Sequence, residues 1–286
     1  MPKFRPIALV VVVLMATAAA AHAQYDMDLD GAETCRHIWR EFGRSMNGHP
    51  RAVYCEVRDV GTFKPASTIE VDGTDKNGVT VRGDTRADAK VRLVVQAQGR
   101  TVDDARALAQ KVTIDLGGKP LRVSGIDRRD QGDNELHFVA ATIVIDAPEK
   151  ADLWLRVNYA PLEVEGVTGR MDLLAAYGPL TLRDAGGDVR ARVEHGPLTV
   201  ELSQSKWDGA GLDAEAEYGP MTLRVPRDFS AQLEIGARHG PLDVDFPLTL
   251  SRLGGSTIQT KLGSGGPKVR AVADYGPMSL QMSREN

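Results

Sequence analysis

Six aromatic side chains recur in one local motif, and they are the residues of this sequence best suited to binding chemistry. Each opens a [Tyr/His]-[Gly/Ala]-Pro-[Leu/Met] unit, and together they are Tyr159, Tyr177, His195, Tyr218, His239 and Tyr275. Imidazole nitrogens are common metal ligands, and aromatic rings combine an apolar body with a polar tip that suits binding surfaces. The motif therefore raises two questions, a shared metal ion and an aromatic binding strip.

The spacing of the two histidines argues against a metal ion. Tyr218 separates His195 from His239 along the repeats, so strand stacking would place the two histidines about 9.5 Å apart. Two imidazoles that share zinc must each bring a nitrogen to about 2.0–2.1 Å from the ion. We therefore expect no metal site and no cofactor.

The rings themselves have two interpretations. They share parity with the inward-facing positions of the flanking strands, which favours rings that close the core at its corner with the O–H or N–H at the edge. The alternative is an exposed strip, formed by Tyr177, His195, Tyr218 and His239, that stacks on glycans or peptides.

The spacing of the motif predicts the elements that position the rings. Successive aromatic residues are 18, 18, 23, 21 and 36 residues apart, and periods near 20 are typical of repeat architectures. The last interval spans two repeats, which predicts a repeat near Ile258 that lacks the motif. Apolar residues alternate on both sides of each corner, at positions −6, −4, −2, +3 and +5 from the aromatic residue. This period of two predicts two half-buried strands per repeat around one core.

Charges along one column indicate how the repeats stack. Position +6 reads Glu165, Arg183, Glu201, Arg224 and Asp245, which alternate in sign. Parallel stacking brings equivalent residues together, where opposite charges are favourable. The sequence therefore predicts an all-β, single-stranded parallel β-solenoid (β-helix) with two short strands per repeat. An antiparallel β-sandwich is the alternative.

The N-terminal half follows the same alternation more loosely. Strands are expected around Ile69, Val79 and Val91, and again from Ile114, Leu121 and Phe138. Thr101 resembles a helix N-cap followed by acidic residues, which predicts a short helix near residues 102–112. This helix is expected to shield one side or end of the stack.

The first residues predict export. Lys3 and Arg5 precede an apolar run that ends at Ala21-His22-Ala23, the layout of a secretory signal peptide. We divide the chain into a signal peptide (1–23), an N-terminal segment (24–60) and a repeat domain (61–284). The mature protein is expected to be periplasmic or extracellular, including the cell surface, with no transmembrane segment after cleavage. Cys35 and Cys55 are then expected to form a disulfide.

Composition argues against nucleic acid as a partner. The formal net charge is −4, and it becomes −6 when cleavage removes Lys3 and Arg5. An acidic chain with mixed charges does not attract polyphosphate. Asp213 and Glu215 lie at positions equivalent to Arg190 and Arg192 one repeat earlier, so ion pairing explains these carboxylates without catalysis.

Several of these segments resemble the bacterial putative-adhesin domain family, a family of unknown function. The resemblance covers residues 55–284 and rests on Asn77-Gly78-Val79-Thr80-Val81, the short helix, the repeated turn-strand units and the segment Gly263–Arg270. This chain has Tyr/His-Gly-Pro where the family commonly has Asn-Gly. The resemblance implies an envelope location and binding, and it carries over no catalytic residue.

These observations lead to two functional hypotheses. The first is a non-enzymatic, adhesin-like envelope protein whose rigid surface binds or scaffolds an unidentified envelope component, a protein or a glycan. The second is a carbohydrate-active β-helix enzyme, a lyase or hydrolase. The sequence contains no group of acid, base and nucleophile that supports the second, and we expect no catalytic residue.

Overall fold

The computed structural model describes residue 35 and residues 52–65, 68–73, 77–125, 138–247, 252–254 and 257–283. The signal peptide expected at residues 1–23 lies outside the described residues. In the part of the chain that is described, no helix is long and apolar enough to cross a membrane.

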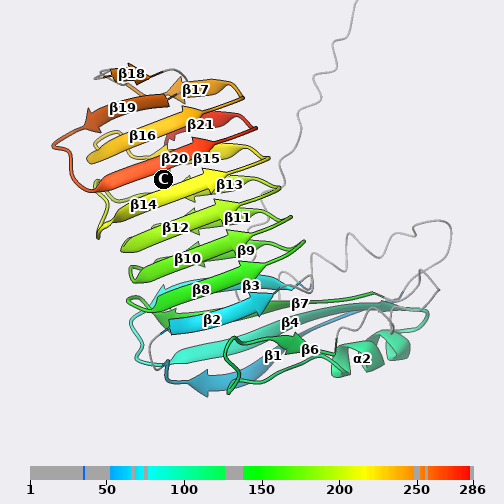
Figure 1. The fold of residues 1–286 in the computed structure, drawn as a ribbon. Coiled ribbons are helices and arrows are strands. Elements are labelled where there is room, and N and C mark those ends of the chain that lie inside the picture. The colour runs from blue at the N-terminus through cyan, green and yellow to red at the C-terminus, as the bar shows by residue number, and fades with distance from the viewer. Residues whose placement is uncertain are drawn as a thin grey trace, which may run out of the picture.

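The N-terminal half forms a layer of long strands with a helix at its side (Figure 1). Its elements are β1 (Ala52–Phe63), β2 (Thr68–Gly73), β3 (Gly78–Asp84), β4 (Ala89–Gly99), α2 (Val102–Gln110), β5 (Thr113–Ile114), β6 (Val123–Ser124) and β7 (Phe138–Pro148). Strands β1, β4 and β7 pair in antiparallel fashion, and β3 pairs with β7 in parallel. The strands expected around Ile69, Val79 and Val91 are confirmed as β2, β3 and β4.

The expected helix is also confirmed, with the N-cap that the sequence predicts. Thr101 Oγ1 accepts a hydrogen bond from the Asp104 amide, and the Asp104 carboxylate accepts one from the Thr101 amide. This reciprocal pair satisfies two backbone donors that a helix start leaves open. The helix packs against β4 and β1 and buries Ala105 and Ala109.

Each [Tyr/His]-[Gly/Ala]-Pro repeat contains two short strands, as predicted. We name each repeat by its corner residue. The pairs are β8 (Asp152–Val157) and β9 (Leu162–Glu165) for Tyr159, β10 (Arg170–Ala175) and β11 (Leu180–Arg183) for Tyr177, β12 (Asp188–Val193) and β13 (Leu198–Glu201) for His195, β14 (Gly211–Ala216) and β15 (Met221–Val225) for Tyr218, β16 (Ala231–Ala237) and β17 (Leu242–Asp245) for His239, and β20 (Lys268–Ala273) and β21 (Met278–Met282) for Tyr275.

The first strands of the repeats lie in one sheet and the second strands in another. The sheet orders are β18-β19-β16-β20-β14-β12-β10-β8-β2 and β1-β4-β7-β3-β9-β11-β13-β15-β21-β17, and β5 and β6 form a small third sheet. Neighbouring repeats pair in parallel and in register, so that Leu173 lies opposite Leu155 and Ala191. The chain is therefore predominantly β, with mixed sheets and mostly parallel pairing (Figure 1).

The alternating residues meet in a single core between the two sheets. At position −4 from the corner, every repeat buries its side chain, and the residues are Leu155, Leu173, Ala191, Ala214, Ile235 and Ala271. Positions +3 and +5 are equally buried except in the His239 repeat, where Leu242 and Val244 are only partly buried. This repeat lies at the end of its sheet, where β17 has one neighbouring strand.

The order of the repeats in space differs from their order in sequence. The Tyr275 repeat is last in the chain, yet it lies between the Tyr218 and His239 repeats, because β20 pairs with β14 and β16 while β21 pairs with β15 and β17. The segment near Ile258, expected to be a further repeat, is instead β19 (Thr257–Leu262). It pairs antiparallel with β16 and with β18 (Arg252–Gly254).

This order corrects the charge column read from the sequence. Arg224 does not face Asp245; it lies opposite Gln281, whose side-chain oxygen accepts a hydrogen bond from Arg224 Nε at 3.1 Å. Around Glu201 the alternation is confirmed by ion pairs, with Arg183 and Arg224 at 3.5 and 3.2 Å from its carboxylate. Glu165 lies opposite Arg183 in the strand register.

Candidate functional site

The six corner rings form one continuous column, which we call the aromatic column. Each strand that leads to the column ends two residues before its ring, at Val157, Ala175, Val193, Ala216, Ala237 or Ala273. In order along the stack, neighbouring ring centroids are 4.6, 4.7, 4.8, 5.0 and 4.5 Å apart, and the column runs Tyr159, Tyr177, His195, Tyr218, Tyr275 and His239. The planes of neighbouring rings differ by 8–11°. The spacing matches the separation of hydrogen-bonded strands.

The rings lie on the surface. Tyr159 and Tyr275 are each 53% exposed, Tyr218 51% and Tyr177 48%, and both histidines are exposed. The expectation that the rings close the core at its corner is therefore wrong. Strand alternation determines a face only inside a strand, and each ring lies in the bend after the first strand of its repeat has ended and before the second begins.

The corner glycines explain why the rings stack so closely. A Cβ atom on Gly178 would come within 2.0 Å of the Ala160 carbonyl oxygen, and one on Gly219 within 1.8 Å of the Gly196 oxygen. Consecutive corners therefore pack backbone against backbone, and only glycine fits. The Tyr159 repeat is the exception with Ala160, and it is the first repeat of the stack that carries the motif.

Close stacking determines which part of each ring a ligand can reach. The ring faces cover one another, with neighbouring centroids 4.5–5.0 Å apart, so inside the column the exposed atoms are ring edges and polar tips. A glycan or peptide therefore cannot lie flat on an internal ring. This differs from the exposed strip considered in the sequence analysis, in which the ring faces stack on the ligand. The column instead offers a regular row of hydroxyl and imidazole groups. Exposed prolines such as Pro179, Pro197 and Pro220 follow each ring two residues later.

Carboxylates lie beside the middle and upper rings, at the position before each ring. These are Glu194, Glu217 and Asp274. The negative charge of Glu217 is the main reason that the pKa of Tyr218 is raised above its usual value, with smaller contributions from burial, Tyr275 and Asp274. Asp274 also lies 3.2 Å from His239 Nδ1 and 3.5 Å from Arg238. Asp274 is thus already paired, and Arg238 precedes the last ring of the column, so Glu194 and Glu217 are the carboxylates beside the middle rings that favour positive charge in a ligand.

The two histidines do not come together. His195 and His239 are separated along the column by two rings, Tyr218 and Tyr275, where the sequence had suggested one. Among the described residues, no group of three or more His, Cys, Asp or Glu side chains has the arrangement of a metal site.

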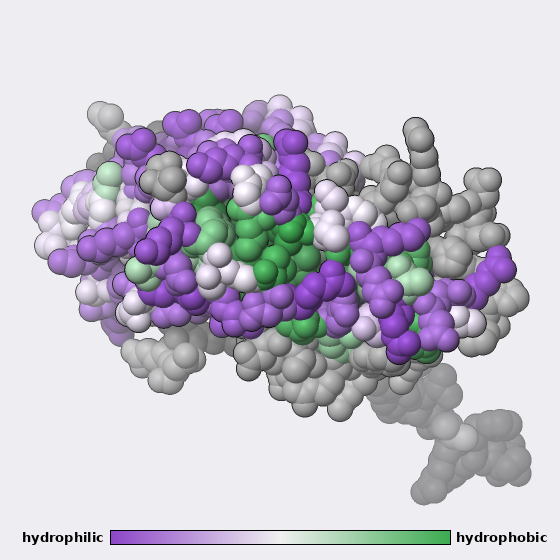
Figure 2. Space-filling view, turned by 90° about the horizontal axis from the view of Figure 1, so that it is seen from below, coloured by the Kyte–Doolittle hydropathy of each residue, from purple (hydrophilic) through white to green (hydrophobic). Residues whose placement is uncertain are grey.

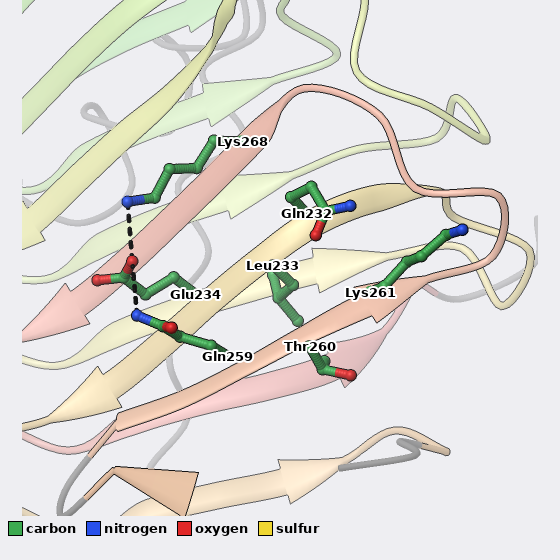
Figure 3. A pocket seen from close by; sticks show the side chains of 7 residues that line it. All are labelled: Gln232, Leu233, Glu234, Gln259, Thr260, Lys261 and Lys268. Carbon is green, nitrogen blue, oxygen red and sulfur yellow. Dashed lines mark hydrogen bonds and ion pairs between the residues drawn. The ribbon is translucent and has the colours of Figure 1, made fainter. Parts of the chain in front are cut away.

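A shallow depression lies where β16 meets β19 and β20, on the sheet opposite the second strands (Figure 3). Its volume is about 570 Å³, and it is lined by Gln232, Leu233, Glu234, Gln259, Thr260, Lys261 and Lys268. Glu234 is the one carboxylate among these residues. It is paired with Lys268 at 2.8 Å and Arg270 at 3.5 Å, and it accepts a hydrogen bond from Gln259. The two-carboxylate arrangement of glycoside hydrolysis does not occur in this depression.

The opposite end of the molecule carries apolar surface. Figure 2, seen from below, shows apolar residues gathered near the centre of this end and surrounded by hydrophilic ones. No site is assigned to this surface.

Comparison with known proteins shows distant likeness only. No protein-family model and no curated protein sequence matches the chain. A crystal structure of a putative cell adhesion protein from Clostridium sporogenes ATCC 15579 shares 12% identity and a TM-score of 0.42, over 81% of this chain and 100% of that one. A crystal structure of a putative adhesin from Bacteroides fragilis NCTC 9343 shares 10% identity and a TM-score of 0.32, over 80% of this chain and 97% of that one. No family is assigned.

The cysteines lie as the sequence predicts. Cys35 and Cys55 form a disulfide with a Cα–Cα distance of 5.5 Å, which joins Cys35 to β1. Disulfides of this kind persist in oxidising compartments.

The acidic neighbours of the column were not singled out in the sequence. Position −1 reads Asn158, Ala176, Glu194, Glu217, Arg238 and Asp274 in chain order, and its acidic cluster becomes apparent only when the Tyr275 repeat is moved next to the Tyr218 repeat. The residues at position −1 can be read from the sequence, but the spatial order of the repeats cannot.

Proposed function

We propose that this chain is an exported, non-enzymatic protein of the cell envelope, whose repeats form a parallel β-solenoid that presents the aromatic column as an adhesin-like binding or scaffolding surface. The observation that carries the proposal is the exposure of six stacked rings in one continuous column. Tyrosine is enriched at binding interfaces, and contiguous exposed apolar patches mark interaction sites.

The chemistry of the column favours one kind of ligand. Ring edges, hydroxyl groups and prolines recur at each step of the stack, and carboxylates lie along one side at Glu194, Glu217 and Asp274. An extended polymer with repeated hydrogen-bonding groups and some positive charge fits this row, whether it is an envelope glycan or a protein. Rigid repeats supply the preorganisation that such binding needs.

Export is supported by two observations. The signal-peptide pattern at residues 1–23 and the Cys35–Cys55 disulfide both fit an oxidising compartment. N-terminal sequencing of protein recovered from cell fractions tests this part of the proposal. A mature chain that begins at Gln24 in the envelope or medium is expected, and an unprocessed chain in the cytoplasm contradicts it.

Binding is tested with the mature protein and purified envelope polymers. The probes are peptidoglycan sacculi, arrayed surface glycans and immobilised envelope proteins. The column variant combines Tyr177→Ala, His195→Ala and Tyr218→Ala, and it is expected to lose binding while its melting temperature changes little. The matched control combines Thr181→Ala, Thr199→Ala and Thr222→Ala, which lie on the outer face of the adjoining sheet at equivalent steps. Equal binding by both variants rejects the column as the binding surface.

Catalysis is tested in parallel. The same polymers are incubated with the mature protein, and new reducing ends or unsaturated products are measured. No product is expected. Product formation that is lost in Glu234→Gln would instead support the carbohydrate-active alternative, with the depression of Figure 3 as its site.

A further inference from the structure

The Tyr275 repeat is held between two repeats that precede it in the chain. Its first strand, β20, pairs in parallel with β14 on one side and β16 on the other, and β21 does the same with β15 and β17. We call the space between these four strands the insertion slot. The edges of these four strands that face the slot supply the backbone hydrogen-bonding groups with which β20 and β21 pair.

The outward charges of the slot and of the inserted repeat are complementary. Arg270 on β20 forms ion pairs with Asp213 and Glu215 on β14 and with Glu234 on β16. Lys268 on β20 also pairs with Glu234, at 2.8 Å. The inserted strand is therefore basic, and both strands that flank it are acidic.

The same charges disfavour direct contact between the flanking repeats. Asp213 and Glu234 both lie opposite Arg270, so stacking β16 directly on β14 in this register would place one carboxylate against the other. Like charges opposite each other destabilise a strand pair. The sequence thus encodes a slot that is stable when a basic strand fills it.

The corner fits the slot as closely as the strands do. Tyr275 stacks 5.0 Å from Tyr218 and 4.5 Å from His239. A Cβ atom on Gly276 would come within 2.0 Å of the Gly219 carbonyl oxygen, so the inserted corner rests directly on the backbone below. The slot therefore selects a glycine corner as well as a basic strand.

A glycine-rich segment connects the inserted repeat to β19. Gly263, Gly265 and Gly266 have φ values of 51°, 81° and 144°, and Pro267 follows them. Glycines at such angles accept other backbone conformations at little steric penalty. The segment is suited to act as a hinge, and a hinge next to a self-contained element is the setting for exchange between identical chains.

We propose that the insertion slot is an interaction site for a second copy of this chain, in which two copies exchange their Lys268–Met282 segments. The exchanged dimer repeats the contacts of the single chain, with the same ion pairs, ring stacking and backbone hydrogen bonds. The two conformations differ mainly at the hinge. Exchange also joins two aromatic columns into one assembly.

Wild-type protein tests the exchange directly, with the disulfide left intact. Chains labelled with ¹⁵N are mixed with unlabelled chains, unfolded in denaturant and refolded at increasing protein concentration. Carbodiimide then couples Lys268 to Glu234, the ion pair at 2.8 Å. In the dimer fraction, coupled peptides that contain one labelled and one unlabelled partner are expected. Dimers with only same-label coupled peptides, or no dimer at any concentration, overturn the proposal.

Charge exchange supplies an independent test. One variant carries Lys268→Glu and Arg270→Glu, and the other carries Asp213→Arg, Glu215→Arg and Glu234→Arg. Within each variant, the inserted strand and its own slot carry like charges and repel. Between the variants the charges match: the acidic segment of the first fits the basic slot of the second, and the basic segment of the second fits the acidic slot of the first. Refolding the mixture is expected to shift the mass from one chain to a mixed pair.

In the control for this charge-reversal test, the first variant is replaced by a protein that carries both Arg190→Glu and Arg192→Glu. These arginines are exposed on β12, outside the slot. A mixture with this control is expected to give no mixed pair. Equal pairing in both mixtures would show nonspecific charge attraction and would refute exchange.

Discussion

Backbone contact between neighbouring corners sets the strictest requirement on single residues. A Cβ atom added to a corner glycine would lie 1.8–2.2 Å from a carbonyl oxygen of the neighbouring corner. This holds for Gly178, Gly219, Gly240 and Gly276. No rotamer relieves such a contact, because the backbone itself must move. The rings can stack at strand spacing only because these corners are glycine.

Replacing Gly219 by alanine is expected to lower the free energy of unfolding by about 1–3 kcal/mol, the usual effect of overpacking. The matched control is Gly117→Ala, whose added Cβ would lie 3.3 Å from a side-chain oxygen of Asp115. Urea denaturation followed by circular dichroism measures both. A Gly219→Ala protein as stable as the control would contradict the close corner contact.

Tyr218 supplies a prediction on pH. The pKa of Tyr218 is raised, chiefly by the charge of Glu217, so the folded state holds this proton more tightly than the unfolded chain does. The associated stability is present below the ordinary tyrosine pKa of about 10 and is lost as pH rises through the raised value.

Glu217→Gln is therefore expected to move the pKa of Tyr218 back towards the ordinary value. A ¹³C NMR titration of tyrosine ring carbons measures the change. Glu165→Gln serves as the control, because Glu165 is the last residue of β9, at the end of that strand away from the column. If Tyr218 titrates unchanged in Glu217→Gln, the assigned cause is wrong.

At the scale of the elements, two charge columns bear on the order of the strands. The +6 column alternates in chain order from Glu165 to Asp245, which suggests that the repeats stack in sequence. The −5 column alternates only when the Tyr275 repeat is inserted, and in spatial order it reads Asp172, Arg190, Asp213, Arg270 and Glu234. Gln281 occupies position +6 of the inserted Tyr275 repeat. It is neutral and accepts a hydrogen bond from Arg224, so insertion brings no like charges together in the +6 column.

Arg270 is the centre of this arrangement. Burial by itself would lower the pKa of Arg270, but Asp213 and Glu215 outweigh burial and raise it. Arg270→Gln is expected to lower the free energy of unfolding by about 1–3 kcal/mol, since it removes charged hydrogen bonds from a mostly buried side chain. Chemical denaturation measures the loss.

Arg190→Gln is the control for Arg270→Gln. Arg190 occupies the same column on β12 but is exposed, so its replacement is expected to change stability by less than about 0.5 kcal/mol. Equal losses in the two variants would show that insertion of the Tyr275 repeat does not depend on Arg270.

The whole molecule combines a stack of repeats with a differently built end. Strands β1, β4 and β7 and the helix α2 stand beyond the repeats, and the Leu121 backbone bonds to Glu70 and Asp72 at the edge of β2. The Cys35–Cys55 disulfide joins Cys35 to β1, the outermost strand of this end.

Replacing both cysteines by serine is expected to lower the free energy of unfolding by about 3 kcal/mol, because the bridge spans 20 residues and restricts the unfolded chain. Urea denaturation of the oxidised protein and the double variant measures the difference. Treating the wild-type protein with reductant should reproduce the loss. Unchanged stability in both cases would contradict a structural disulfide.

The sequence alone was sufficient for the local structure of the repeats. Apolar residues at alternate positions and a Gly-Pro corner predict where each strand begins and ends, because strand pleating and backbone sterics act within a few residues. Thr101 and Asp104 likewise predict the helix start, and two cysteines that follow a signal-peptide pattern predict their own bond.

Only the tertiary structure decided the direction of the rings and the order of the repeats. The rings turn outward because their strands end two residues earlier, so alternation no longer applies to Tyr177 or His195. The position of the Tyr275 repeat depends on which neighbours it pairs with. All six repeats present similar apolar faces, and the charges that distinguish the neighbours, such as those paired with Arg270, come from segments far apart in the sequence that no local pattern relates.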